Sequence, residues 1–202
     1  MKVESFITSP IGTNTYLVSE NGRGILIDVG SDAEDLYLYA LKEGITLEAV
    51  LLTHGHFDHA NGCAELQQKG IKIYIHEADA EKLYTYKGMA AFAGVKLNAF
   101  KADEFVEDGE TLSLMGKKIN VLHTPGHSKG SVCYVIDDSV FCGDTLFCGS
   151  YGRYDVYDGD LNELKNSAKK IFSLNGDYKL YPGHGEFSTL DEERKTNPIN
   201  FD

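Results

Sequence analysis

The chain has 202 residues, of which 42% are hydrophobic and 25% are charged, and this composition predicts one ordinary globular domain spanning residues 1–202. Its formal net charge of −12 opposes binding to nucleic acid and to anionic membrane surfaces. No apolar run reaches membrane-span length and no basic segment with an apolar core precedes the first predicted strand, so we expect a cytoplasmic protein without a membrane partner.

The first 44 residues alternate short apolar segments with turn-forming ones. Pro10-Ile11-Gly12 and Glu20-Asn21-Gly22 separate three predicted strands, at residues 2–8, 14–19 and 24–28. Ser31 and Glu34 form a potential capping box, and apolar residues then recur at helical spacing until Gly44. We therefore expect three strands followed by a helix.

The next segment concentrates groups that bind metals. An apolar strand at residues 49–53 leads into three imidazoles and one carboxylate within six residues, namely His54, His56, Asp58 and His59. On an extended backbone alternate side chains share a face, so His54 and His56 can point at one spot. Asp58 and His59 follow in a glycine-containing turn, before a helix predicted at 60–69. Imidazole suits zinc, copper, iron and nickel, and carboxylate also suits manganese, so this run predicts a metal site; the alternative is a polar loop with chance histidines.

The rest of the chain predicts further strands and helices. A strand is expected at 71–75 and a helix beginning at His76, whereas residues 83–100 carry aromatic residues without a clear period and suit a lid, a subunit contact or an irregular packed connection. Hairpins are expected at 111–123 and 131–142, a helix at 161–172, a strand at 179–181, and a last short helix capped by Thr189 and Glu192. Two runs of strands interleaved with helices predict layered sheets with helices outside.

Four cysteines form no close CxxC pair. They predict small buried residues of a reducing compartment rather than disulfides or a structural zinc site: Cys63, Cys133, Cys142 and Cys148.

Three more potential ligands follow predicted strands on loops that contain glycine or proline. They are His127 in Thr124-Pro125-Gly126-His127, Asp144 in Gly143-Asp144-Thr145, and His184 in Pro182-Gly183-His184. With the first run this makes five histidines and two aspartates, which exceeds the four ligands of one tetrahedral zinc. The set fits two metals that share a bridging carboxylate and a bridging hydroxide.

The combination of His-x-His-x-Asp-His, a separate His, Gly-Asp and a final Gly-His resembles the metallo-β-lactamase-fold hydrolases over nearly the whole chain. The resemblance implies an α/β (α+β) fold, a four-layered αβ/βα sandwich with the metals at one edge between the sheets. It implies that His54, His56 and His127 bind one metal, that Asp58, His59 and His184 bind the other, and that Asp144 bridges them. His76 and His123 fall outside this set. We expect His76 to lie at the start of a helix, and His123 to be a core residue or to support a ligand.

The segment from Gly143 to Asp155, in which Gly-Asp-Thr-Leu-Phe leads to Gly-Arg-x-Asp, resembles the short glyoxalase II-like proteins. That resemblance implies a thioesterase of the hydroxyacylglutathione hydrolase type, with Arg153 and Tyr151 contacting a small anionic substrate such as a glutathione thioester. Arg153 in a structural salt bridge is an equal alternative. Glyoxalase II proper adds a C-terminal helical domain, which we do not expect in this chain.

The implied cofactors are two divalent ions, with zinc expected first and iron or manganese as alternatives. They would hold hydroxide near neutral pH, with Asp58 helping to fix this nucleophile, and would stabilise the oxyanion of the substrate. The alternatives are a persulfide dioxygenase with a single iron, a lactonase or nuclease of the same fold, and a metal-binding module without turnover.

Overall fold

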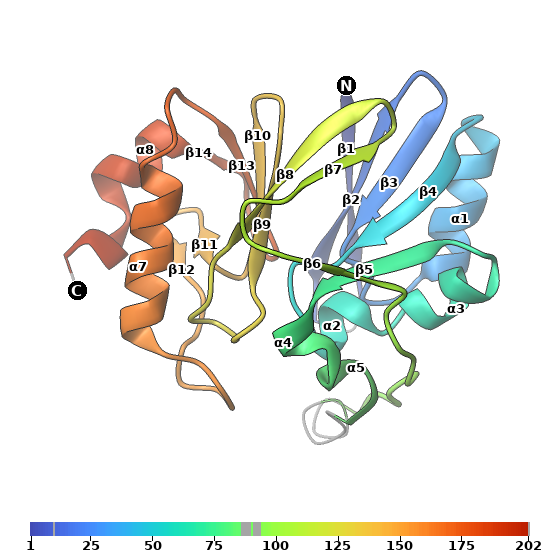
Figure 1. Cartoon of the computed structure of the whole chain (residues 1–202), viewed down its shortest axis with the longest axis horizontal. Coiled ribbons are helices and arrows are strands. Elements are labelled where there is room, and N and C mark those ends of the chain that lie inside the picture. Colours follow the sequence, from blue (N-terminus) through green and yellow to red (C-terminus); the bar gives the residue numbers. More distant parts are fainter. Residues whose placement is uncertain (10, 86–89, 91–93, 202) are drawn as a thin grey trace.

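The computed structural model describes residues 1–9, 11–85, 90 and 94–201, and it contains two six-stranded mixed sheets packed face to face (Figure 1). The first sheet has the spatial order β1-β2-β3-β4-β5-β6, in which β1, β2 and β3 are antiparallel neighbours and β3 to β6 are parallel. Its strands are β1 (Lys2–Thr8), β2 (Thr13–Glu20), β3 (Arg23–Ile27), β4 (Thr46–Leu51), β5 (Lys72–His76) and β6 (Glu104–Val106).

The second sheet has the order β14-β13-β10-β9-β8-β7, with β10 and β13 parallel and the other neighbours antiparallel. Its strands are β7 (Thr111–Leu114), β8 (Lys117–His123), β9 (Val132–Ile136), β10 (Ser139–Gly143), β13 (Lys179–Pro182) and β14 (Ser188–Thr189). A separate two-stranded ribbon joins β11 (Leu146–Phe147) to β12 (Ser150–Tyr151).

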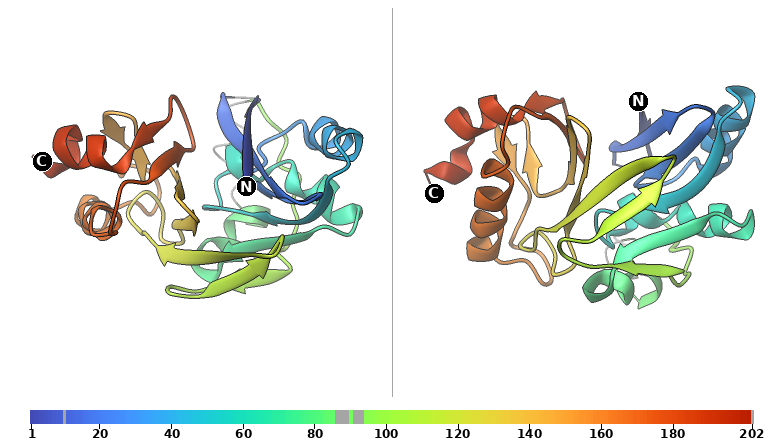
Figure 2. Two further views of the ribbon diagram at one scale, coloured as in Figure 1. Left: turned by 90° about the horizontal axis from the view of Figure 1, so that it is seen from above. Right: turned by 45° about the horizontal axis from the view of Figure 1, so that its top comes forward.

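Helices cover the outer face of each sheet (Figures 1 and 2). The first half carries α1 (Ala33–Lys42), α2 (Phe57–Ala60), α3 (Cys63–Gln68), α4 (Glu77–Ala80) and α5 (Lys82–Thr85), and the second carries α7 (Leu161–Phe172), α8 (Leu190–Thr196) and a 3-10 turn (Pro198–Asn200). Among the described residues, no helix combines the length and the apolar character needed to cross a bilayer.

Three clusters of buried apolar side chains fill the spaces between these layers. Because successive side chains of a strand point to opposite faces, Leu26 of β3 packs toward α1 and α3, while Ile25 and Ile27 pack between the sheets. The third cluster joins the second sheet to α7 through Leu164 and Ile171. Both faces of each sheet are therefore covered, and the predicted four-layered sandwich is confirmed.

The strand before the histidines begins and ends earlier than predicted, at Thr46–Leu51 instead of 49–53. β4 ends at Leu51 rather than at residue 53, so His54 and His56 lie in a loop and not on extended strand. The reason is that two amide groups beyond Leu52 bond to carboxylates: Thr53 N donates to Asp28 Oδ1 (2.7 Å), and Gly55 N donates to Asp79 Oδ2 (2.8 Å). Carboxylate side chains from other elements therefore accept the hydrogen bonds that a neighbouring strand would otherwise accept.

Two predictions about helices were wrong. The helix expected at 60–69 is two helices, α2 and α3, because Gly62 N donates to Val29 O (2.9 Å) instead of continuing the first; Asp58 and His59 consequently lie in α2 and not in a turn. The capping box also fails, because Asp32 is the N-cap of α1 with φ of 57° and its carboxylate accepts from Ser31 Oγ (2.7 Å).

Other elements follow the sequence more closely. His76 begins α4 by accepting from Ala78 N (3.2 Å), and Thr189 caps α8 by accepting from Glu192 N (3.3 Å). Strands β6, β11, β12 and β14 were not predicted, since each has only two or three residues. Part of the aromatic segment 83–100, including residues 86–89 and 91–93, lies outside the described residues.

Three cysteines are buried as expected, but Cys148 is exposed.

Candidate metal centre

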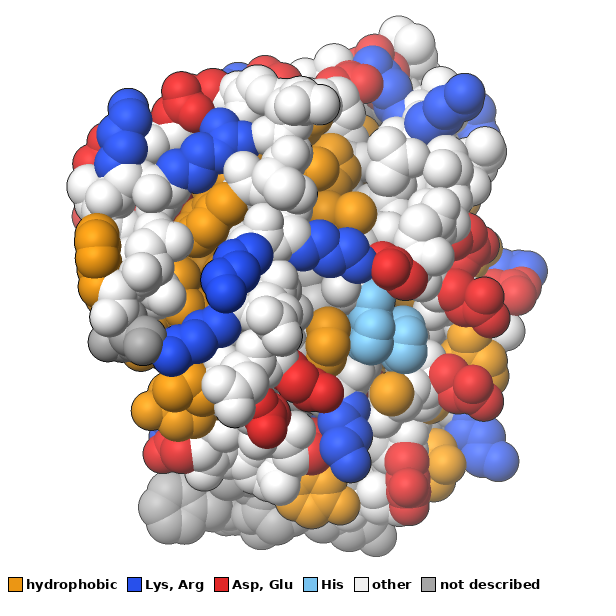
Figure 3. Space-filling view, turned by 60° about the vertical axis from the view of Figure 1, so that its left-hand side comes forward, with side chains coloured by type: hydrophobic (Ala, Val, Ile, Leu, Met, Phe, Trp, Pro, Cys, Tyr) orange, Lys and Arg blue, Asp and Glu red, His pale blue; other side chains and the backbone are white. Residues whose placement is uncertain are grey.

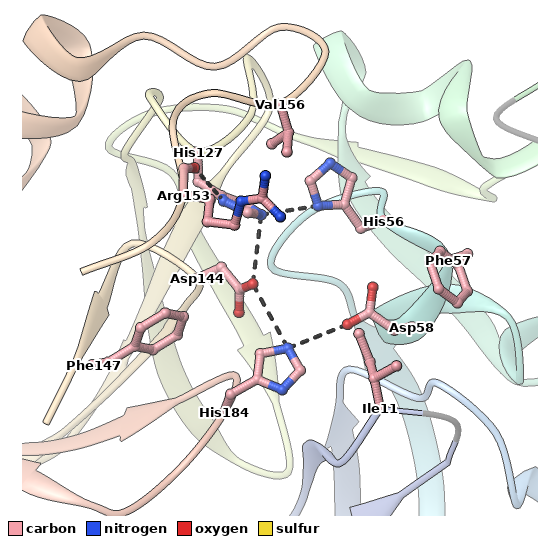
Figure 4. Close-up of a pocket in the computed structure, with 10 residues that line it drawn as sticks. All are labelled: Ile11, His56, Phe57, Asp58, His127, Asp144, Phe147, Arg153, Val156 and His184. Carbon is pink, nitrogen blue, oxygen red and sulfur yellow. Dashed lines mark hydrogen bonds and ion pairs between the residues drawn. The ribbon is translucent and has the colours of Figure 1, made fainter. Parts of the chain in front are cut away.

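The seven side chains singled out in the sequence meet at one edge of the two sheets. Figure 4 shows five of them: His56, Asp58, His127, Asp144 and His184. Four follow β4, in its loop and in α2, and the other three follow β8, β10 and β13. β9 is antiparallel to both β8 and β10, so β8, β10 and β13 all run in the same direction. Loops at the carboxyl ends of these strands therefore reach the same edge, where the rigid sheet positions them.

Three imidazoles form the first group of potential ligands. His56 Nδ1 lies 3.0 Å from His54 Nε2 and 2.9 Å from His127 Nε2. All three residues are buried, and their ring nitrogens point at one another from two separate loops. Such a group of nitrogen donors suits a divalent transition metal.

A second group combines one carboxylate with two imidazoles. Asp58 Oδ2 lies 3.3 Å from His59 Nε2 and 3.2 Å from His184 Nε2. The donor atoms of these three residues all lie within 4.8 Å of one another.

Asp144 lies between the two groups. Its Oδ2 is 3.5 Å from His127 Nε2 and 3.7 Å from His184 Nε2, and its Oδ1 is 3.4 Å from His59 Nε2. One carboxylate therefore faces members of both groups, which is the position that a bridging ligand requires.

Two polar atoms at the centre support the fit to cations. Asp144 Oδ1 and His59 Nε2 are buried, and apart from the ion-pair contacts of 3.3–3.4 Å given above they have no hydrogen bond of regular geometry among the described residues. A buried polar atom left unsatisfied costs about 1–3 kcal/mol, so such atoms are uncommon and need a reason. Nitrogen and oxygen donors converging from two groups, with a shared carboxylate, match the needs of two divalent ions.

Neighbouring groups orient the imidazoles. Asp28 Oδ2 accepts from His59 Nδ1 (2.8 Å), and Arg153 O accepts from His127 Nδ1 (2.7 Å), so each ring presents Nε2 to the centre. Thr13 Oγ1 donates to Asp58 Oδ2 (3.0 Å). The sequence interpretation missed Asp28, although an aspartate at the end of an apolar strand was a signal, and the structure gives it a positive φ of 55°.

The two groups differ in electrostatics. Burial lowers the pKa of His54 well below its ordinary value, and burial beside the His127 imidazole lowers the pKa of His56 to about 4. Burial also disfavours the charge of His59, but the carboxylates of Asp58 and Asp144 prevail and raise its pKa well above the ordinary value. Burial similarly opposes the charge of Asp144, yet His59 holds the pKa of that carboxyl at about 2. In the metal-free protein His54 and His56 are thus neutral, while His59 of the second group holds a proton.

A cleft of about 270 Å³ opens above this centre. Its lining combines potential ligands with apolar side chains and one arginine (Figure 4): Ile11, His56, Phe57, Asp58, His127, Asp144, Phe147, Arg153, Val156 and His184. The four apolar residues were not identified from the sequence, because nothing in their spacing links them to the histidines.

The predicted substrate contacts differ in position. Arg153 lines the cleft and also pairs with Asp155 (Nε to Oδ1, 2.9 Å), so both interpretations of this residue are compatible with its place. Tyr151 is not among the described lining residues; it is partly buried against the apolar cluster under α7. His76 and His123 stack on each other with ring centroids 4.1 Å apart, outside both groups, and His123 is half-buried rather than in the core.

Comparison with known proteins gives consistent matches. A family model described as the metallo-beta-lactamase superfamily matches residues 8–184. The chain is 31% identical over 205 residues to the "Probable metallo-hydrolase YqgX" of Bacillus subtilis, covering 98% of this chain and 97% of the relative. It is 32% identical over 207 residues to the "Hydroxyacylglutathione hydrolase GloC" of Haemophilus influenzae, covering 98% of each.

Solved structures match over the same length. The crystal structure of BLEG-1 B3 metallo-beta-lactamase has a TM-score of 0.92 at 32% identity and covers 98% of this chain and 99% of its own. That of TTHA1623 in a di-iron-bound form has a TM-score of 0.89 at 35% identity and covers 98% of this chain and all of its own.

Proposed function

Because this chain belongs to the metallo-beta-lactamase superfamily and is a metal-dependent hydrolase of that fold, we propose that it hydrolyses thioesters at a binuclear centre, as a glyoxalase II-like enzyme of the hydroxyacylglutathione hydrolase type. The proposed ligands are His54, His56 and His127 for one ion and Asp58, His59 and His184 for the other, with Asp144 between them.

One observation carries this proposal: seven buried or half-buried imidazoles and carboxylates from both halves of the molecule converge, and five of them line one cleft. The full-length similarity to GloC adds the thioester class, and the similarity to a di-iron form of TTHA1623 makes iron as well as zinc a candidate metal.

When bound, two divalent ions would lower the pKa of a bound water and polarise a carbonyl oxygen. The protein's own groups hold the centre in place. Asp28 and Arg153 O fix the rings of His59 and His127, and Thr13 fixes the Asp58 carboxylate that would orient the attacking water. Phe57 and Phe147 line opposite sides of the cleft and would limit the access of bulk water (Figure 4).

The lining of the cleft favours a good leaving group. Every imidazole and carboxylate among its described lining residues belongs to the seven proposed ligands, and the guanidinium of Arg153 does not titrate near neutral pH. No side chain is therefore left over to protonate a poor leaving group such as an amine. A thiolate needs little protonation, and Arg153 at the rim would attract an anionic thiol moiety.

A second candidate is β-lactam hydrolysis, which the similarity to BLEG-1 B3 metallo-beta-lactamase favours. It uses the same centre but must expel an amine rather than a thiolate. The two activities can be compared directly on one preparation of protein.

To test the proposal, protein purified without added metal is analysed for its elements and assayed with S-lactoylglutathione, with a β-lactam, and for oxygen uptake with glutathione persulfide. We expect about two ions per chain and a kcat/KM for the thioester at least about 100-fold above that for the β-lactam. Asp144→Asn is the control and should lose at least one ion and most turnover, on the order of 100-fold or more. Full metal content without thioester turnover, or full activity in Asp144→Asn, contradicts the proposal.

A further inference from the structure

Asp79, in α4, is a fully buried carboxylate that accepts hydrogen bonds from three different segments. Its Oδ2 accepts from Gly55 N (2.8 Å) and from Ser128 Oγ (2.7 Å), and its Oδ1 accepts from Gly130 N (2.7 Å) and from the Lys82 ammonium. Four donors on one carboxylate saturate it, and charged acceptors of this kind form the stronger hydrogen bonds.

Two of these segments carry histidines of the first group. Gly55 lies between His54 and His56, and Ser128 follows His127 directly. The first of these loops follows β4 in the first sheet, and the second joins β8 to β9 in the other. Asp79 is therefore a common anchor for two loops that approach the centre from opposite halves of the molecule.

The packing around Asp79 is also close. A Cβ added to Gly55 would lie 2.7 Å from Asp79 O, and one added to Gly130 would lie 2.6 Å from Asp79 Cβ. Real Cβ atoms do not approach so near, so both positions require glycine while Asp79 remains where it is. Gly55 inside the His-x-His motif is therefore required by its close contact with Asp79 of α4.

The charge of Asp79 is balanced within the same cluster. The Lys82 ammonium, whose side chain is only 6% exposed, also bonds to Asp158 Oδ2 (2.8 Å), which in turn accepts from Lys129 N (3.3 Å). Removing one partner from a buried ion pair leaves an uncompensated charge and is costly. A neutral replacement at position 79 therefore disturbs both loops and Lys82.

We infer that Asp79 is a positioning residue for the first group of ligands: by holding the Gly55 and Ser128 segments together, it sets the relative placement of His54, His56 and His127 and hence the affinity of that site for metal. The inference rests on the binuclear centre proposed above. It assigns no such role to Asp79 at the second group, where Asp28 and Thr13 orient the ligands.

Asp79→Asn tests this in the full chain. In either orientation of the new amide, its NH₂ group faces donors from which the carboxylate accepted hydrogen bonds, and those hydrogen bonds are lost. Metal-free wild type and variant are titrated with Co²⁺, following the visible absorption of the bound ion and the number of equivalents. We expect one equivalent to bind about 10–100-fold more weakly in the variant, with an altered absorption spectrum, and the other to change by less than about 3-fold.

Glu193→Gln is the matched control, because Glu193 is a buried carboxylate that accepts from Gly149 N (3.1 Å), Asn197 Nδ2 (2.7 Å) and Ser188 Oγ (2.5 Å), none of which belongs to a loop of the first group. It should lower thermal stability without changing the Co²⁺ affinity of the first group. Ser128→Ala removes a single donor to Asp79 and should shift the same equivalent in the same direction, by less. It provides the test if Asp79→Asn does not fold.

The inference would be overturned if both equivalents of Co²⁺ bound more weakly to the same extent. It would also be overturned if the affinities and the spectrum were unchanged in Asp79→Asn or in Ser128→Ala. The titration needs no substrate. A wild type that binds two equivalents but turns over no thioester therefore contradicts the proposed activity while leaving the role of Asp79 open to this same measurement.

Discussion

At the scale of single residues, identical side chains acquire opposite properties from their surroundings. His54 and His56 are buried among other imidazoles, and their pKa values fall, whereas His59 is buried between carboxylates, and its pKa rises. Burial acts in the same direction on all three. The neighbouring charges decide which ring is ready to bind a metal and which must first lose a proton.

This difference predicts unequal proton release. In the metal-free protein near pH 7, His54 and His56 are neutral, because their folded pKa values lie below the ordinary 6.5, while His59 is protonated because its pKa lies above it. Because the pKa of His184 in the second group is raised as well, binding at the second group should release more protons than binding at the first. Calorimetric titration in buffers of different ionisation enthalpy measures this number for each equivalent. Equal release from both equivalents would show that the charge states are wrong.

At the scale of elements, the loop after β4 and the helix α2 are held by side-chain carboxylates. Asp28 anchors Thr53 and His59, and Asp79 anchors Gly55. The segment is also pressed against the loop after β3, where Val29 N donates to His59 O (2.6 Å). Ligand placement thus depends on contacts between elements that are distant in sequence.

Gly30 shows how tight this contact is. A Cβ at Gly30 would lie 1.9 Å from the backbone oxygen of Asp58, so Gly30→Ala must push α2 away. We expect a loss of about 1–3 kcal/mol in the free energy of unfolding, together with weaker metal binding at the second group. Urea denaturation and metal titration measure the two effects.

The comparison variant is Gly70→Ala, because nothing lies within 4 Å of the position of its Cβ, although its φ is +85°. It should lower stability by about 1 kcal/mol through backbone strain and leave metal binding unchanged. If Gly30→Ala costs no more than Gly70→Ala and binds metal normally, the close approach of the two loops is not important.

At the scale of the whole molecule, the proposed ligands come from both halves of the sandwich: four from the loop and helix after β4 and three from the second half (Figure 2). A metal pair would therefore link two sheets that otherwise meet through an apolar interface. On the face shown in Figure 3, acidic and basic side chains both occur. That no nucleic acid binds stays a prediction.

This arrangement predicts that metal removal destabilises the entire chain. A ligand that binds only the folded state stabilises it by about 2.7 kcal/mol at 100 times its Kd. For a chain of this length that corresponds to a fall in Tm of about 5–10 °C on chelation. Calorimetry with and without chelator measures the shift, and His184→Ala should reduce it. An unchanged Tm after verified metal loss would mean that the ions do not join the halves.

Much of this organisation was predictable from local sequence. Alternation of apolar residues located most strands, and the helix at residues 161–172 was predicted at its observed bounds, because short-range periodicity reflects which face of an element is buried. The metallo-β-lactamase fold and the seven candidate ligands were likewise identified from motifs that stand directly after strands. The single-domain organisation and the cytoplasmic location stay predictions.

Only the tertiary structure decided how these residues are used. It ended β4 early, divided the helix after the histidines, placed Asp28 and Asp79 behind the ligand loops, and brought Phe57, Phe147 and Val156 over the centre. None of these features has a local pattern, because each depends on a hydrogen bond or contact between segments that are far apart in the chain. The sequence determined which groups could bind metal, and the packing of the two sheets determined where they meet.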